Sequence, residues 1–129
     1  MIGLFLLTHS TYGEALIQCA CHVLNKRPLQ IVQLGVAAQD DPLDALPLAR
    51  DMLKLVDTGR GVLILTDIYG ATPSNLGMKL LEPGRIEGIA GVNLPMLLRA
   101  IAYRDKDMET LITRTVAGGR DGVLTMPKP

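Results

Sequence analysis

Short apolar runs alternate along the chain with longer segments in which apolar residues recur every three to four positions. The apolar runs cover residues 1–7, 29–36, 62–66 and 86–92. Runs of this kind are typical of strands buried on both faces. Helical spacing of apolar residues predicts helices at 11–26, 47–56, 72–82, 93–103 and 108–117. Strands that alternate with helices indicate a mainly parallel four-stranded sheet with helices on both faces.

Local signals mark the ends of several of these elements. Pro28 ends the first helix, and the Thr72-Pro73 pair predicts a capping side chain followed by proline at the first helical position. Pro47 is tolerated only if its helix starts close to it. The glycines of "AGGRDG" predict a turn before a last strand at 123–126. This strand lacks a crossover helix after it, so we expect it to add antiparallel at a sheet edge.

Length and composition fit one α/β domain that spans residues 1–129. Hydrophobic residues make up 48% of the chain and charged residues 20%, enough apolar surface for a proper core. The formal net charge is zero, which argues against nucleic acid and against a polybasic membrane anchor. No apolar run approaches a membrane span, and the start lacks the features of a signal peptide. Cys19 and Cys21 are too close for a useful disulfide, which favours reduced thiols in the cytoplasm.

Polar residues follow two of the predicted strands, in "THSTYG" and in "TDIYGATPSN". The carboxyl ends of parallel strands meet at one edge of the sheet, where ligands bind, so we expect His9 and Asp67 to lie together there. Each segment leads into a helix start, with Ser10 or Thr11 as one cap and Thr72 as the other. Helix starts offer backbone N–H groups and a positive dipole end, both suited to a phosphate.

A histidine beside a carboxylate can act as a nucleophile toward phosphorus. One ring nitrogen attacks, while a carboxylate that accepts from the other nitrogen fixes the tautomer and stabilises the developing cation. The alternative is that His9 only caps a strand end and Asp67 only orders its own loop. The residues alone leave these two interpretations level. Cys19 and His22 have a spacing suited to two metal ligands, but the sequence offers no third or fourth ligand, so we expect no metal site.

Three motifs resemble a known family. "THS" after an apolar first strand, then "LTDIYGATPSN", then "IAGVNLPMLL" are similar to the enzyme IIA domain of the mannose class of the bacterial phosphoenolpyruvate-dependent sugar phosphotransferase system. The resemblance runs from residue 2 to about 126, in the family's order and spacing. It implies that His9 is phosphorylated, that Asp67 hydrogen-bonds it, and that Thr72 replaces the usual serine that contacts the phosphate. Ser10 stands where the family often has glycine. In this variant the chain is similar to the related IIA-like domain of the dihydroxyacetone kinase system.

The resemblance also implies partners and an assembly. His9 would accept a phosphoryl group from the histidine-containing phosphocarrier protein and pass it to an enzyme IIB partner for sugar uptake. No metal or organic cofactor is needed for this step, and the terminal strand would be exchanged in a homodimer. Two other functions stay open: a regulatory module that uses the phosphohistidine as a signal, and a small-ligand binder that is never phosphorylated. Neighbouring genes for IIB and membrane components would favour transport.

Overall fold

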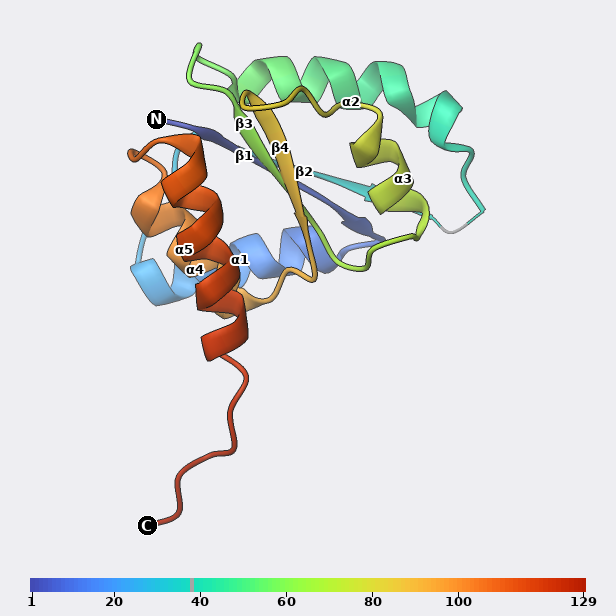
Figure 1. The fold of residues 1–129 in the computed structure, drawn as a ribbon. Coiled ribbons are helices and arrows are strands. Elements are labelled where there is room, and N and C mark those ends of the chain that lie inside the picture. Colours follow the sequence, from blue (N-terminus) through green and yellow to red (C-terminus); the bar gives the residue numbers. More distant parts are fainter. Residues whose placement is uncertain (38) are drawn as a thin grey trace.

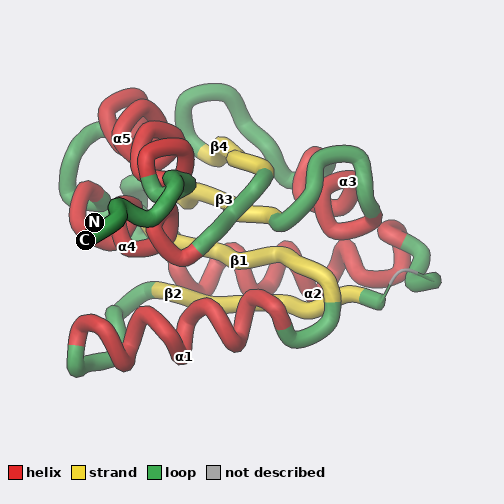
Figure 2. Tube along the Cα trace, turned by 90° about the horizontal axis from the view of Figure 1, so that it is seen from below, coloured by secondary structure: helices red, strands yellow, loops and turns green. Residues whose placement is uncertain are grey.

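A four-stranded parallel sheet lies at the centre of the computed structural model, which describes residues 1–37 and 39–129 (Figure 1). The strands are β1 (Gly3–His9), β2 (Ile31–Val36), β3 (Val62–Thr66) and β4 (Ile86–Ala90). The helices are α1 (Tyr12–Leu24), α2 (Pro42–Val56), α3 (Thr72–Met78), α4 (Leu94–Tyr103) and α5 (Met108–Asp121). The strands follow the order β2-β1-β3-β4, which can be followed in Figure 2, where the four strands lie side by side. The predicted parallel sheet is therefore confirmed.

The alternating side chains of β1 build two separate cores. Leu4 and Leu6 face α1, α4 and α5, while Phe5 and Leu7 face α2 and α3, and all four are fully buried. A strand covered on both faces has no solvent side, which explains why its sequence is apolar without alternation. The same logic holds for β3, whose five residues are all buried.

The predicted boundaries shift in several elements. β1 runs two residues further, to His9, and β4 ends at Ala90 instead of residue 92. α1 ends at Leu24 because Asn25 takes a left-handed conformation, with φ of 55°, before Pro28 is reached. The helix expected at 72–82 stops at Met78, and its cap is Ala71, so Thr72 is the first helical residue and not the cap.

Helix α2 begins at Pro42, five residues before the predicted start. The Asp41 side chain accepts a hydrogen bond from the Leu43 backbone N–H, and Pro42 occupies the first helical position, where its missing N–H costs nothing. Pro47 therefore lies inside the helix. The turn before it is retained because Ala45 and Leu46 pack against the core beneath α2.

The predicted turn at "AGGRDG" is wrong, because Gly118 and Gly119 are buried inside α5. A Cβ at Gly118 would lie 2.6 Å from the Arg99 Cβ, and one at Gly119 would lie 2.6 Å from the Met96 Cε. These contacts come from α4, which crosses α5 too closely for side chains at these two positions. The glycines serve helix packing and not chain reversal.

The tail after α5 forms no strand in the single chain. Residues 123–129, all of them described, extend away from the body of the protein (Figure 1). Val123, Leu124 and Met126 are 77%, 67% and 83% exposed. The predicted edge strand is thus not formed within one chain, and its exchange between two chains stays a prediction.

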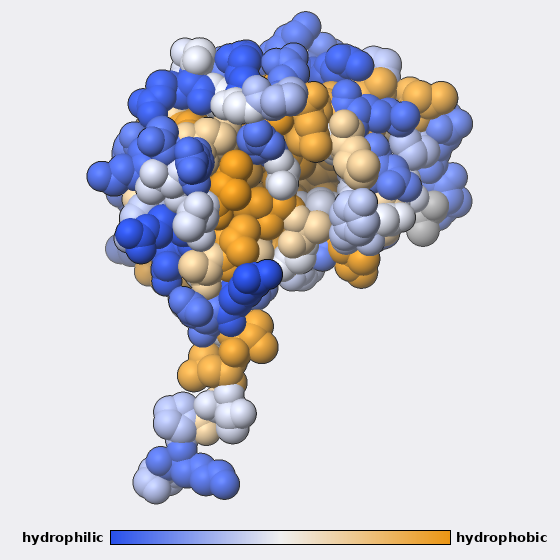
Figure 3. All heavy atoms as spheres, in the orientation of Figure 1, coloured by the Kyte–Doolittle hydropathy of each residue, from blue (hydrophilic) through white to orange (hydrophobic). Residues whose placement is uncertain are grey.

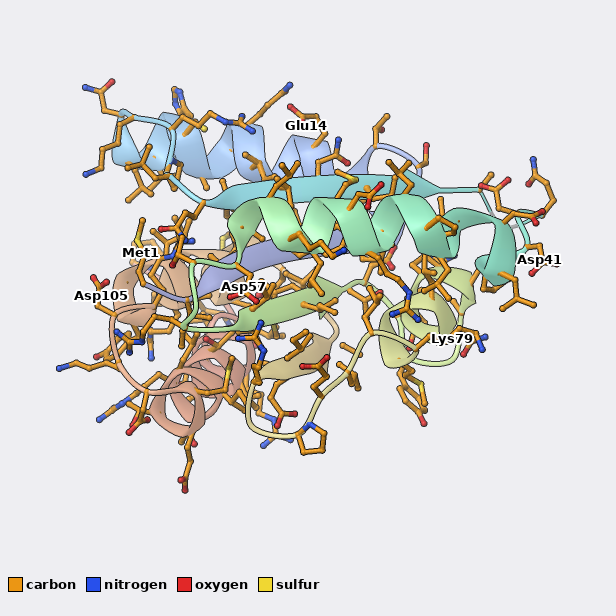
Figure 4. All side chains as sticks on the ribbon, turned by 90° about the horizontal axis from the view of Figure 1, so that it is seen from above. Met1, Glu14, Asp41, Asp57, Lys79 and Asp105 are labelled. Carbon is orange, nitrogen blue, oxygen red and sulfur yellow. The ribbon has the colours of Figure 1, made fainter. Side chains whose placement is uncertain are left out.

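A buried arginine closes the end of the sheet opposite the polar segments. Arg104 is 3% exposed and donates to the backbone oxygens of Ile2 at 3.0 Å, Leu29 at 2.5 Å and Gln30 at 2.5 Å. Figure 4 shows this end of the molecule, marked by Met1, Asp57 and Asp105, with Asp41 at the other end. The guanidinium supplies donors to carbonyls at the strand starts, where Gln30 also accepts the Leu4 backbone N–H at 3.1 Å.

Candidate functional site

His9 and Asp67 meet at the carboxyl edge of the sheet. His9 is the last residue of β1, and Asp67 follows the last residue of the neighbouring β3. One carboxylate oxygen, Asp67 Oδ2, lies 2.9 Å from His9 Nδ1 and accepts the His9 backbone N–H at 3.1 Å. The predicted proximity of these two residues is confirmed.

This contact determines which ring nitrogen can react. An ionised carboxylate only accepts hydrogen bonds, so in the neutral imidazole Nδ1 must carry the proton. Nε2 then keeps its lone pair, and the His9 side chain is 32% exposed while that of Asp67 is 12% exposed. The arrangement leaves a lone pair on Nε2 of a partly exposed ring, with a mostly buried carboxylate on the other ring nitrogen.

The Asp67 carboxylate is held in its charged form. Burial on its own would raise the pKa of Asp67, but the hydrogen bonds from the His9 backbone and ring outweigh it and bring the pKa below its ordinary value. The second oxygen, Oδ1, accepts from the Ile68 backbone N–H at 3.2 Å and from the Thr66 hydroxyl at 3.5 Å. Asp67 therefore has a fixed orientation before any ligand arrives.

The turn that follows His9 is locked by contacts on both sides. The buried Thr8 hydroxyl accepts the Gly13 backbone N–H at 2.8 Å, which ties the strand end to the first turn of α1. The Ser10 backbone N–H donates to the Val36 oxygen at 3.1 Å on β2. Ser10 has a φ of +48°, a left-handed conformation that costs a residue with a side chain about 1–2 kcal/mol. The serine side chain is exposed beside His9.

A glycine on β2 makes this turn possible. A Cβ at Gly35 would lie 1.9 Å from the Ser10 backbone oxygen and 2.9 Å from its carbonyl carbon. The Ser10 backbone thus rests directly against β2, at a point where any side chain would push it away. Gly35 is far from His9 in sequence, and sequence reasoning did not single it out.

The two predicted hydroxyl residues lie at the starts of the flanking helices. Ser10 directly follows His9 and precedes α1, whose cap residue Thr11 makes no side-chain capping bond. Thr72 is the half-buried first residue of α3, five positions after Asp67. Of the two expected cap candidates for α1, Thr11 is the cap residue, although its side chain makes no capping bond. The expectation that Thr72 caps α3 is wrong, because Ala71 holds that position.

Tyr12 is a further residue of this region that sequence reasoning missed. It is the first residue of α1, and its hydroxyl donates to the Val92 oxygen at 2.8 Å. Burial and the negative charge of Asp67 raise the pKa of Tyr12. The only sequence signal was an aromatic residue at the start of the first helix, three positions after His9.

Metal-binding side chains do not gather in the described part of the chain. Within residues 1–37 and 39–129, no group of three or more histidine, cysteine, aspartate or glutamate side chains is placed to hold a metal ion. Within the same residues, no helix is long and apolar enough to cross a membrane.

A family model and curated proteins match this chain, over nearly its full length or over part of it. Residues 3–116 match the model of the family described as PTS system fructose IIA component. The PTS system mannose-specific EIIAB component of Escherichia coli strain K12 is 29% identical over 125 residues, which cover 95% of this chain and 38% of that protein. The PTS system fructose-specific EIIA component of Bacillus subtilis strain 168 is 41% identical over 54 residues, which cover 41% of this chain and 37% of that protein.

Solved structures share the fold. The mannose/sorbose specific IIA subunit from Enterococcus faecalis superposes with a TM-score of 0.86 at 22% identity, covering 99% of this chain and 96% of the other. The EIIA component from Streptococcus agalactiae gives a TM-score of 0.83 at 20% identity and covers 97% of both chains. The chain spans about two fifths of the EIIAB relative, 38% of its length. Since the family model covers most of the chain, the protein belongs to the mannose-class enzyme IIA family of the bacterial phosphotransferase system.

Proposed function

We propose that the protein is a phosphocarrier that accepts a phosphoryl group on His9 and passes it on. The observation that carries this proposal is the contact of His9 Nδ1 with Asp67, which leaves Nε2 as the exposed nucleophile. The donor is the histidine-containing phosphocarrier protein and the acceptor an enzyme IIB partner, as family membership suggests. Such an exchange places the domain, residues 1–129, in the cytoplasm.

The transfer step follows from the geometry. The Nε2 lone pair attacks the phosphorus of the donor's phosphohistidine, a new N–P bond forms, and the donor's N–P bond breaks with the electron pair returning to its imidazole. The His9 ring becomes cationic, and the Asp67 carboxylate on Nδ1 stabilises that charge. In the second transfer a nucleophile of the IIB partner attacks the same phosphorus, and His9 leaves as a neutral imidazole.

The hydroxyls of Ser10 and Thr72 are suited to the phosphoryl oxygens. Ser10 is exposed beside the reactive ring, and the positive end of the α1 dipole begins two residues later. Thr72 begins α3 on the other side of Asp67. Both residues would bind oxygens of the phosphoryl group and not the phosphorus itself.

The chain offers a matched pair of variants for testing the site, because His9 and His22 are its two histidines. Incubation with phosphoenolpyruvate, enzyme I and the phosphocarrier protein should add one acid-labile, base-stable phosphoryl group to the wild type and to His22→Gln. The His9→Gln variant should take up none. Label that remains on His9→Gln contradicts the assignment. A phosphorylated chain that no IIB protein can discharge supports the regulatory alternative.

Substitutions of Asp67 and of Thr72 should have different effects in the same assay. In Asp67→Asn the amide can present either a donor or an acceptor to Nδ1, so the ring loses its fixed tautomer and transfer slows in both directions. Thr72→Ala removes one hydroxyl donor and should cost about one hydrogen bond, 0.5–1.5 kcal/mol of transition-state stabilisation. Nitrogen NMR of the unphosphorylated His9 ring should change in Asp67→Asn and stay unchanged in Thr72→Ala. The opposite pattern contradicts these roles.

We also propose that two chains exchange their tails to form a homodimer. β4 is an edge strand. On the side away from β3, the Ile86 N–H donates to the Glu82 oxygen at 2.8 Å, and the Ile86 oxygen accepts the Glu82 N–H at 2.9 Å. Since backbone direction alternates along a strand, Gly88 and Ala90 direct their N–H and C=O groups to the same open side. Both residues are exposed. An unpaired edge of this kind invites a further strand.

An apolar hollow of about 210 Å³ adjoins this open edge, and Ile64, Gly77 and Gly88 are among its lining residues. Figure 3 shows apolar surface between α5 and α3, and apolar atoms at the start of the tail. Leu124 and Met126 lie two residues apart, so in a strand both would point to one face. The tail of a second chain supplies the strand and the apolar side chains that this edge lacks.

The dimer has its own test. Truncation after Gly122 removes the tail and leaves α5 whole, so the truncated chain should sediment as a monomer at micromolar concentration. Leu124→Asp should weaken the dimer, whereas Thr125→Asp adds the same charge on the other face of the strand and should weaken it less. A full-length monomer, or an unaffected truncated dimer, contradicts tail exchange.

A further inference from the structure

Tyr12 links the two segments that carry the candidate site residues. It lies three residues after His9, and its hydroxyl donates to the Val92 oxygen at 2.8 Å, across a sequence separation of 80 residues. Tyr12 as a whole is 40% exposed, while Val92, whose oxygen its hydroxyl reaches, is 3% exposed. A buried carbonyl that loses its donor is costly, so this bond restrains both segments.

The loop that Tyr12 contacts is itself bonded to the strand end before Asp67. The backbone N–H groups of Gly91 and Val92 both donate to the Thr66 oxygen, at 2.9 and 3.0 Å. Thr66 is the last residue of β3 and directly precedes Asp67. A continuous path therefore runs from the start of α1 through Val92 and Thr66 to Asp67, and the His9–Asp67 hydrogen bond closes it into a ring.

The charge of the Asp67 carboxylate acts on the Tyr12 hydroxyl. Burial raises the pKa of Tyr12, and the charge of Asp67 raises it further. The hydroxyl thus stays protonated and able to donate throughout the neutral range, so the link to Val92 persists while Asp67 is ionised.

We propose that Tyr12 is a positioning residue that holds Asp67 against His9 through Val92. It does not touch the phosphoryl group; it fixes the separation of the two residues that do the chemistry. The simpler alternative is that the Tyr12 ring only packs at the start of α1. The hydroxyl separates the two interpretations, because Tyr12→Phe keeps the ring and removes only the donor. The effect on transfer rests on the proposed phosphocarrier function, whereas the effect on the His9 ring does not.

The matched control is Tyr103→Phe, the same chemical change on the last turn of α4, where the ring lies under the Arg114 guanidinium at 5.5 Å. In Tyr12→Phe we expect phosphoryl transfer to His9 to slow about two- to tenfold, the range of one hydrogen bond. We also expect the NMR signals of the unphosphorylated His9 ring, including the Nδ1 proton, to shift. Tyr103→Phe should leave both at wild-type values.

A double-mutant cycle decides between positioning and simple packing. If Tyr12 acts through Asp67, then Tyr12→Phe should slow transfer much less in an Asp67→Asn background than in the wild type. Equal factors in the two backgrounds, or wild-type rates and His9 ring signals in Tyr12→Phe, overturn the proposal. Should the wild type take up no phosphoryl group, the phosphocarrier function fails, and the His9 ring signals still test Tyr12.

Discussion

Replacing Gly35 with alanine should disable the site without touching either of its candidate catalytic residues. The new Cβ would lie 1.9 Å from the Ser10 backbone oxygen, whereas ordinary contact begins at 3.4 Å. The strand and the turn must therefore separate by about 1.5 Å between them. β2 is fixed to β1 along its whole length, so we expect the turn to give way.

The cost of this movement can be estimated for the fold and for transfer separately. Overpacking of this kind lowers the free energy of unfolding by about 1–3 kcal/mol. The moving turn also strains the Ser10 bond to the Val36 oxygen and carries His9 away from Asp67, whose contact with Nδ1 is 2.9 Å. A displacement of about 1 Å at a reacting group costs on the order of 100-fold in rate.

Gly3→Ala provides the control for lost stability. A Cβ at Gly3 would lie 2.3 Å from the Val56 backbone oxygen, so the clash has the same nature, but it lies at the opposite end of β1 from His9. Urea unfolding should show comparable losses in both variants. Phosphoryl uptake per folded molecule should fall by about 100-fold in Gly35→Ala alone.

The reasoning fails if Gly35→Ala, measured while folded, takes up phosphate at the wild-type rate. It also fails if Gly3→Ala loses transfer to the same degree, because the effect would then be one of general destabilisation. Unchanged His9 and Asp67 NMR signals in Gly35→Ala would likewise contradict a displaced turn.

Three further perturbations have expected outcomes. Ser10→Gly relieves the left-handed backbone, and after subtracting the added freedom of glycine in the unfolded chain it should raise the free energy of unfolding by about 0.5–1 kcal/mol, as measured by thermal unfolding. The same variant lacks the serine hydroxyl, so its phosphohistidine should lose label faster, as measured by label decay. Arg104→Leu removes the guanidinium donors to the Ile2, Leu29 and Gln30 carbonyls, and Gln30 keeps only the Leu4 backbone N–H. Urea unfolding should show a loss of about 2–4 kcal/mol. Because the pKa of Asp67 is lowered in the folded protein, the Asp67 carboxylate contributes its full stabilisation above its ordinary pKa, and this stabilisation is lost as the pH falls through the lowered pKa. Asp67→Asn should therefore flatten the acid-unfolding profile over this pH range.

The sheet was predictable because burial on both faces leaves a plain signal in the sequence. The central strands β1 and β3 are apolar runs, while the edge strands β2 and β4 are mostly apolar and only partly buried. Each connection contains a helix, so the parallel arrangement follows with little freedom. The start of α2 had a local signal that the sequence analysis missed, because Asp41 followed by Pro42 is a capping side chain before a proline at the first helical position. The end of α5 was not predictable from local rules. Gly118 and Gly119 have a turn-like composition but serve a close helix crossing.

The site was predictable as far as it follows strand order. His9 and Asp67 end adjacent parallel strands, so their proximity needed only the sheet topology. The support around them depends on distances that no motif encodes. Gly35 matters because the Ser10 oxygen lies against it, and Tyr12 because Val92 reaches its hydroxyl. Both contacts join segments distant in the chain, and one sequence alone does not reveal such contacts.

The buried Arg104 has a consequence for the order in which the chain can fold during synthesis. Its guanidinium holds carbonyls that precede it by 102, 75 and 74 residues, at Ile2, Leu29 and Gln30. β1 leaves the ribosome first, yet it lies between β2 and β3 in the sheet, so its two partners emerge only later. Its open end is closed last, when residue 104 has left the exit tunnel. A nascent chain that has not yet released residue 104 lacks the guanidinium donor for the Ile2 carbonyl, which directly precedes the strand around which both cores are built.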